Sequence, residues 1–205
     1  MKPIKICGIN DAGFAAAALD AGVAFLGFIF AKKSPRRVTP PVAKTIRETI
    51  KPSNHQTLKP LFVGVFVEQQ IDEILEIARQ IPLDVIQLHS PAYTEDDVKA
   101  AKSAGYEVWR LDSHGAETSA ADAILLDGAA AGVFGGTGRL ADWSRIDELK
   151  RAGRRVVLAG GIGAANIADA LATHADIIDI NSSLETSPGR KSIALLEELF
   201  DGLIV

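Results

Sequence analysis

The sequence has a single cysteine, Cys7, and it lacks both a long hydrophobic run and an excess of basic residues. The longest apolar stretch, residues 21–31, contains two glycines and is too short for a bilayer, since a membrane-spanning helix needs about twenty apolar residues. The 22 Lys and Arg residues are outnumbered by 26 Asp and Glu, so charge gives no reason to expect binding to nucleic acid. With no disulfide partner and no secretory signal pattern, the sequence predicts a protein of the reducing cytoplasm.

What is present is enough apolar material for a sizeable core. The chain has 205 residues, of which 47% are hydrophobic, and a chain of this size buries roughly 70% of its surface on folding. No linker or shift in composition divides it. We therefore expect a single domain over residues 1–205.

The dominant pattern is an alternation of short apolar runs with longer, alanine-rich or amphipathic segments. The longer segments have the spacing of helices and lie at 12–21, 41–50, 68–80, 94–103, 142–151, 164–172 and 192–203. The short runs are typical of strands buried on both faces and lie at 3–7, 25–30, 61–66, 85–88, 106–111, 123–126, 155–159 and 177–180.

Eight strand–helix units favour an α/β fold closed into a (β/α)₈ barrel, also called a TIM barrel. Few residues separate the fifth and sixth strands, so the helix between them is expected to be short or degenerate. An open, doubly wound parallel sheet is the alternative, because the strand pattern by itself does not prove closure.

Polar residues stand where several of the apolar runs stop. They are Cys7 after the first run, His89 after the fourth, Asp127 after the sixth and Asp179 in the eighth. The carboxyl ends of barrel strands are where such folds keep their chemistry. Cys7 on its own is either a packed core thiol or a reactive one. His89 on its own reads equally well as a structural hydrogen-bonding residue, and no second ligand makes a metal site with it.

Two glycine-rich segments and a serine pair suggest a phosphate site. Residues 134–138 follow the sixth strand, residues 158–163 follow the seventh, and Ser182 with Ser183 follows the eighth. Glycine lets the backbone approach an anion closely, and loops after strands seven and eight often hold phosphate in this fold. Turns alone would explain either glycine segment taken singly.

Arg36 lies in a basic loop after the second strand, in Lys-Ser-Pro-Arg-Arg-Val at 33–38. Its planar guanidinium suits a carboxylate. The other reading is a solvated run of charge, which we prefer for Lys32, Lys33 and Arg37.

Taken in order, these motifs resemble those of the phosphoribosylanthranilate isomerase family. The series runs through the whole chain, and the start Lys-Ile-Cys-Gly separates it from other phosphate-binding barrels. It comprises 5–8, 26–30 (Leu-Gly-Phe-Ile-Phe), 33–38, 63–67 (Val-Gly-Val-Phe-Val), 84–89 (Asp-Val-Ile-Gln-Leu-His), 125–127, 135–138, 142–143, 158–162, 179–185 and 188–191 (Pro-Gly-Arg-Lys).

The resemblance implies an isomerase of tryptophan biosynthesis that carries out an Amadori rearrangement without a cofactor or metal. It implies Cys7 as general base, Asp127 as general acid and Arg36 as the group that holds the substrate's carboxylate. His89 and Asp179 would support them. The implied phosphate-binding residues are Gly136, Thr137, Gly161, Ser182 and Ser183. The implied partner is a small-molecule substrate, with the chain a monomer or a homodimer.

The sequence departs from the family pattern at several places. Asn10 and Asp11 replace the usual residues after the cysteine motif, and they do not supply the positive charge that a thiolate needs. Ser90, Ala141 and Ser183 stand where Gly, Phe and Gly are usual. The Cβ of Ser183 is expected to crowd the phosphate unless its hydroxyl joins the site. We expect these departures to affect the affinity for the substrate more than the acid–base chemistry, because Cys7, Arg36 and Asp127 are all present.

Two other functions remain open at this stage. One is a related barrel that binds a sugar phosphate without turnover. The other is another phosphate-binding barrel, of the indole-glycerol-phosphate or thiamine-phosphate synthase type; the former needs a lysine at a strand end, and none is apparent.

Overall fold

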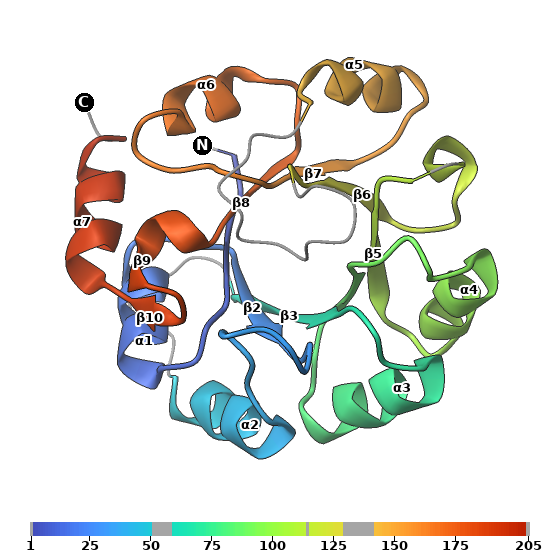
Figure 1. The fold of residues 1–205 in the computed structure, drawn as a ribbon, viewed down its shortest axis with the longest axis horizontal. Helices are drawn as coiled ribbons and strands as arrows, with labels where there is room; N and C mark the ends of the chain where they lie inside the picture. Colours follow the sequence, from blue (N-terminus) through green and yellow to red (C-terminus); the bar gives the residue numbers. More distant parts are fainter. Residues whose placement is uncertain (1, 51–58, 114, 129–141, 204–205) are drawn as a thin grey trace.

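Eight parallel strands close into a barrel in the computed structural model, which describes residues 2–50, 59–113, 115–128 and 142–203 (Figure 1). Each strand pairs with its neighbours in sequence, and β1 pairs with β8 to close the ring, with Lys5 opposite Asp179. The strands are β1 Ile4–Cys7, β2 Phe25–Ile29, β3 Leu61–Phe66, β4 Val85–Leu88, β5 Glu107–Leu111, β6 Ala123–Leu126, β7 Val156–Leu158 and β8 Ile177–Ile180. The barrel prediction is confirmed, and the open sheet is excluded.

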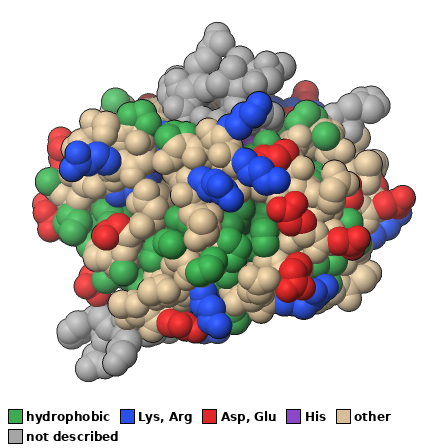
Figure 2. All heavy atoms as spheres, turned by 60° about the horizontal axis from the view of Figure 1, so that its bottom comes forward, with side chains coloured by type: hydrophobic (Ala, Val, Ile, Leu, Met, Phe, Trp, Pro, Cys, Tyr) green, Lys and Arg blue, Asp and Glu red, His purple; other side chains and the backbone are tan. Residues whose placement is uncertain are grey.

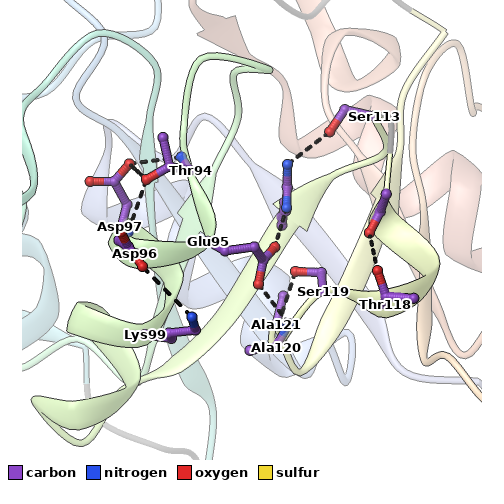
Figure 3. A network of polar contacts seen from close by, with 12 residues as sticks. Thr94, Glu95, Asp96, Asp97, Lys99, Ser113, Thr118, Ser119, Ala120 and Ala121 are labelled. Atoms are coloured by element: carbon purple, nitrogen blue, oxygen red, sulfur yellow. Dashed lines mark hydrogen bonds and ion pairs between the residues drawn. The ribbon is translucent and has the colours of Figure 1, made fainter.

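The helices form an outer ring around the strands (Figure 1). They are α1 Ala12–Asp20, α2 Pro40–Thr49, α3 Ile71–Gln80, α4 Glu95–Ser103, α5 Ser144–Arg151, α6 Ile167–Ala172 and α7 Ile193–Asp201. All seven were predicted, and α4 and α7 begin one residue later than expected because Thr94 and Ser192 are their N-caps. Thr94 also forms a capping box with Asp97 (Figure 3).

Alternation along each strand divides the core in two. One set of strand residues packs outward against the helices, and the other set fills the barrel interior. The interior set includes Val63, Val65 and Trp109, all fully or almost fully buried. Lys5 belongs to the same inward-facing set and is itself 0% exposed, so a charged side chain lies inside the barrel.

The connection between β5 and β6 contains only a 3₁₀ turn, Ala116–Thr118, as expected. In place of a packed helix, a polar network attaches this connection to α4 and β5 (Figure 3). Glu95 of α4 pairs with Arg110 of β5 and accepts a hydrogen bond from the backbone N–H of Ala120 at 2.9 Å. Arg110 also donates to the hydroxyl of Ser113 at 3.1 Å. This network fixes the short connection against α4.

A small antiparallel hairpin follows β8 and was not predicted. A 3₁₀ turn, Ser182–Leu184, leads into β9 Glu185–Ser187, which pairs with β10 Arg190–Lys191. Gly189 lies in the turn with a φ of 82°, a conformation that favours glycine. The hairpin places three charged side chains beside the carboxyl end of the barrel.

The surface is an ordinary mixture of side chains on the face drawn in Figure 2. Basic and acidic side chains are interspersed there, with hydrophobic side chains between them. Within the described ranges, the structure has no helix that is both long and apolar enough to cross a membrane.

Candidate active site at the barrel mouth

A pocket opens at the carboxyl ends of the strands and contains most of the predicted site residues. Its lining includes Cys7, Arg36, His89, Asp127, Gly161, Asp179 and Ser182. Ser183 lies outside this lining, and Gly136 and Thr137 fall outside the described residues. The structure therefore brings together side chains from five of the eight strand ends.

Strand periodicity explains why these side chains face one another. Asp127 lies two residues beyond Leu125, and Asp179 two beyond Ile177, both of which point into the barrel. Side chains two apart on a strand share a face. The same rule places Cys7 two residues beyond Lys5, so thiol and ammonium lie on one side of β1.

Cys7 is 5% exposed and packs beside Gly27 of the neighbouring strand. A Cβ on Gly27 would lie 3.1 Å from the Cys7 sulfur and 3.1 Å from Cε of Lys5, so glycine makes room for both side chains. Burial raises the pKa of the Cys7 thiol above its ordinary value, although Lys5 and Lys191 act in the opposite direction. The thiol is thus mainly protonated in the free protein, with two cations in place for its thiolate.

Lys5 connects the two inward-facing groups beneath the pocket. Its Nζ donates to Oδ2 of Asp179 at 2.5 Å, and both side chains are buried. Burial would lower the pKa of Lys5, but Asp179 and Cys7 outweigh it and the pKa is raised, so the lysine stays charged. Burial raises the pKa of Asp179 against the effect of Lys5. Lys5 and Lys191 thus supply the positive charge near Cys7. The sequence analysis had found no such charge in the residues that follow Cys7.

Asn10 and Asp11, the departures after Cys7, have structural roles instead. Asp11 caps α1 by accepting from the backbone N–H of Phe14 at 2.7 Å. Asn10 donates to the carbonyl of Gly189 at 2.8 Å and so ties the start of the chain to the hairpin. Both residues position backbone near the pocket rather than supply charge to it.

His89 links Asp127 to the interior. Its Nε2 lies 3.0 Å from Oδ2 of Asp127, and its Nδ1 lies 3.1 Å from Nε2 of Gln87. When the Gln87 amide donates to Nδ1, a neutral ring carries its proton on Nε2 and donates it to Asp127. His89 therefore holds the orientation of the carboxyl group across the pocket from Cys7.

Two buried oxygens in the pocket lining have no hydrogen-bond partner among the described residues. They are Oδ1 of Asp179 and Oε1 of Gln87, on side chains 6% and 1% exposed. An unsatisfied buried acceptor costs about 1–3 kcal/mol. A ligand that brings hydroxyl or N–H donors would satisfy both oxygens.

Arg36 reaches the pocket but is already engaged. Its Nε and Nη2 donate to the two carboxylate oxygens of Glu185, each at 2.8 Å. Lys191 lies 3.0 Å from the same carboxylate. Arg36 is 6% exposed, so it is a fixed pocket residue and not part of a solvated run of charge.

The glycine loop after β7 has left-handed backbone conformations, which let backbone N–H groups approach an anion closely. Gly160 and Gly161 have φ values of 85° and 66°, and Gly161 lines the pocket. The hydroxyl of Ser183 donates to the carbonyl of Ile162 at 2.6 Å. A Cβ on Gly163 would lie 2.6 Å from that of Ser183, so Gly163 provides the space that Ser183 occupies.

Sequence reasoning missed the residues that surround and support the predicted ones. Lys5, Gln87, Asn181, Glu185 and Lys191 all contact them, and only the inward-facing register of Lys5 and Gln87 was visible as a signal. Among the described residues, no group of three or more His, Cys, Asp or Glu side chains is arranged to hold a metal ion.

The fold and the pocket define a class: a TIM-barrel enzyme with a thiol and a carboxyl group in one pocket at the barrel mouth. Comparison with known proteins makes the class more specific. A family model described as N-(5'phosphoribosyl)anthranilate (PRA) isomerase matches residues 4–202. The N-(5'-phosphoribosyl)anthranilate isomerase of Priestia megaterium is 35% identical over 206 residues, covering 95% of this chain and 96% of its own. The chain belongs to the phosphoribosylanthranilate isomerase family.

Solved structures agree with this assignment. The phosphoribosyl anthranilate isomerase of Thermus thermophilus is 32% identical with a TM-score of 0.86, and 98% of each chain is covered. A second isomerase structure, in complex with reduced 1-(o-carboxyphenylamino)-1-deoxyribulose 5-phosphate, is 27% identical with a TM-score of 0.81 and the same coverage. A third, from Thermotoga maritima, is of monomers generated from a dimeric isomerase; it is 28% identical with a TM-score of 0.79, again at 98% of both chains.

Proposed function

We propose that this barrel, as a single domain over residues 1–205, isomerises N-(5'-phosphoribosyl)anthranilate to 1-(2-carboxyphenylamino)-1-deoxyribulose 5-phosphate in tryptophan biosynthesis. The observation that carries the proposal is the placement of Cys7 and Asp127 in one pocket, in a chain of this family. An aldose-to-ketose rearrangement needs both an acid and a base at one sugar.

Asp127 acts first, as the general acid. It gives its proton to the ring oxygen of the furanose while the bond between that oxygen and C1' breaks. The nitrogen lone pair then forms the C1'–N double bond of a Schiff base. His89, 3.0 Å from Asp127, keeps the carboxyl group aimed at the ring.

Cys7 acts second, as the general base. Its thiolate takes the proton from C2', and the electron pair of that bond moves toward the Schiff base to give an enolamine. The enolamine becomes the ketone when the C2' hydroxyl loses its proton and C1' gains one. Lys5 stabilises the thiolate because its ammonium lies beneath it on the same face of β1.

The remaining residues hold the substrate in place. Asp179 and Gln87 accept hydrogen bonds from sugar hydroxyls through their two unpaired oxygens. Arg36 binds the anthranilate carboxylate. The phosphate binds at Gly136, Thr137, Gly161, Ser182 and Ser183, and Ser183 takes part through its backbone because its hydroxyl is already bonded to Ile162.

The test measures turnover by the variants Cys7→Ala and Asp127→Asn. The assay is the change in fluorescence as the anthranilate adduct is consumed. Each variant should lose a factor of about 10² to 10⁴, the usual contribution of one acid–base group. Both should still bind the reduced product analogue, which shows that the pocket is intact. A loss below tenfold in both variants would contradict the assignment.

The second candidate, a barrel that binds a sugar phosphate without turnover, predicts a different result. Wild-type protein would then bind the reduced analogue but show no turnover, and its gene would fail to restore growth of a tryptophan auxotroph lacking this isomerase. We also propose that the protein is cytoplasmic and is either a monomer or a homodimer. Light scattering distinguishes these two oligomeric states.

A further inference from the structure

We propose that Glu185 is a positioning residue that selects which edge of the Arg36 guanidinium meets the carboxylate of the substrate. The proposal rests on the function proposed above and deepens it. It starts from a pairing that the sequence did not predict, between residues 149 positions apart.

The geometry of the pair leaves one edge of Arg36 available. Glu185 takes Nε and Nη2 with both of its oxygens, at 2.8 Å each, which is the fork-to-fork arrangement of a bidentate pair. A guanidinium has five N–H groups, and this arrangement uses two of them. The edge formed by Nη1 and the second N–H of Nη2 is the one that a ligand carboxylate can bind.

Glu185 is itself held from several sides. Its side chain is 3% exposed. Gly189 donates its backbone N–H to Oε2 at 3.2 Å, and Lys191 lies 3.0 Å from Oε1. Lys191 also donates to the carbonyl and side-chain oxygens of Asn181, at 2.8 and 2.9 Å. The hairpin of β9 and β10 is therefore a rigid support for this carboxylate.

The stem of Arg36 is packed just as closely. A Cβ on Gly8 would lie 3.0 Å from Cδ of Arg36 and 2.9 Å from Oδ1 of Asn181. A Cβ on Gly189 would lie 2.6 Å from the carbonyl oxygen of Pro35. Both glycines have positive φ values, so the chain gives up side chains at two places to let Arg36 and the hairpin come together.

The charges at this corner are incomplete without a ligand. In the part of the chain that the structure describes, two buried cations, Arg36 and Lys191, form ion pairs with the same anion, Glu185. A second carboxylate on the free edge of Arg36 balances the group. A neutral ring in the same place leaves one buried positive charge without a partner, which is unfavourable. The corner therefore distinguishes a carboxylated aromatic ring from a plain one.

The experiment measures binding of two ligands by calorimetry. One is the reduced 1-(o-carboxyphenylamino)-1-deoxyribulose 5-phosphate, and the other is its phenylamino counterpart without the carboxylate. Glu185→Gln should weaken the first by about tenfold to a hundredfold, because a misaimed clamp loses a factor of this size. It should change affinity for the second by less than about twofold. In kinetics, KM should rise while kcat changes little.

Glu95→Gln is the matched control, because Glu95 also pairs with a buried arginine and also accepts a backbone N–H, but its partner Arg110, unlike Arg36, lies outside the pocket lining. It should leave the affinity for both ligands unchanged. Glu185→Asp serves as a second variant if Glu185→Gln folds poorly. It keeps the charge but withdraws the carboxylate by one methylene, so it should show the same preference for loss of the carboxylated ligand, to a smaller extent.

Two results would overturn the proposal. One is an equal loss of affinity for both ligands, which a purely structural role would cause. The other is no loss for either. Failure of the wild-type protein to bind the carboxylated ligand is a separate result, and it would refute the proposed function instead.

Discussion

The barrel contains two arginine–glutamate pairs with similar hydrogen bonds and different surroundings. Arg36 and Glu185 meet between the loop after β2 and the hairpin after β8, with side chains 8% and 3% exposed. Arg110 and Glu95 meet between β5 and α4, where Arg110 is equally buried but the glutamate side chain is 37% exposed. Both carboxylates also accept a backbone N–H, from Gly189 and Ala120 respectively, but Glu185 is shared with a second cation, Lys191.

The difference shows how one kind of contact serves two purposes. The pair at Glu95 holds a connection that contains only a 3₁₀ turn (Figure 3), and the Glu95 side chain is partly exposed to water. In the pair at Glu185, Arg36 lines the ligand pocket, and Glu185 is the anion that Arg36 and Lys191 share. Removing a partner from a buried ion pair leaves an uncompensated charge, while an exposed pair contributes little.

The largest expected effect is a difference in stability between variants of the two pairs. Glu185→Ala should lower the free energy of unfolding by about 3–5 kcal/mol, because Arg36 and Lys191 remain buried without an anion. Glu95→Ala should lower it by about 1 kcal/mol, because it leaves one cation rather than two, and Arg110 keeps its hydrogen bond to Ser113 at a site that the partly exposed glutamate opens to water. Urea denaturation of both variants measures the difference, and equal losses would contradict this account of burial.

A smaller effect concerns activity at the thiol. Lys5→Met should lower kcat by about tenfold to a hundredfold, the range of one well-placed electrostatic group. The pKa of Cys7 is already raised by burial, and loss of Lys5 raises it further. The rising limb of the pH–rate profile should therefore move to higher pH, and alkylation of Cys7 by iodoacetamide at a fixed pH should slow.

The control for Lys5 is Lys102→Met, which removes a lysine that also pairs with an aspartate, Asp122, but is 35% exposed. Its kcat and pH profile should match those of the wild type. An unchanged pH profile in Lys5→Met would show that the ammonium does not act on the thiolate.

The smallest expected effect is on the pH dependence of stability that is linked to Glu185. Burial would raise the pKa of Glu185, but Arg36 and Lys191 outweigh it and hold the pKa below its usual value. A lowered carboxyl pKa stabilises the fold above the unfolded-state value of about 4.3, and that stabilisation is lost as pH falls through the folded-state value. Unfolding free energies at pH 7 and pH 4 should therefore differ less in Glu185→Gln than in the wild type; an equal difference would show that Glu185 has no linked proton.

The sequence was enough to predict the barrel, because its strands are continuous apolar runs of the right length and spacing. It also predicted the short connection after β5, since too few residues remain there for a helix. The hairpin escaped notice because β9 and β10 are three and two residues long and polar, with no alternation to read. Such an element depends on Gly189 and on contacts with Pro35 and Asn10 that are remote in sequence.

The site was predictable where a residue ends a strand and not where it lies beside or beneath one. Cys7 ends β1 and Asp127 directly follows β6, so the fold itself indicates where they meet. Lys5 lies inside a strand, where a lysine is normally expected to face solvent. The two-residue spacing from Cys7 indicates that Lys5 faces inward, but its partner Asp179 is 174 residues away in the sequence, so the local pattern does not identify the ion pair.

Closure of the ring by β1 and β8 has a consequence for synthesis of the chain. Ribosomes add about 5–20 residues each second, and 174 residues separate Lys5 from its partner Asp179. The first strand therefore waits roughly 10–35 seconds before the last strand and hairpin emerge to enclose it. Throughout that interval two of the charged groups that act on Cys7 in the barrel, Asp179 and Lys191, have not yet been synthesised.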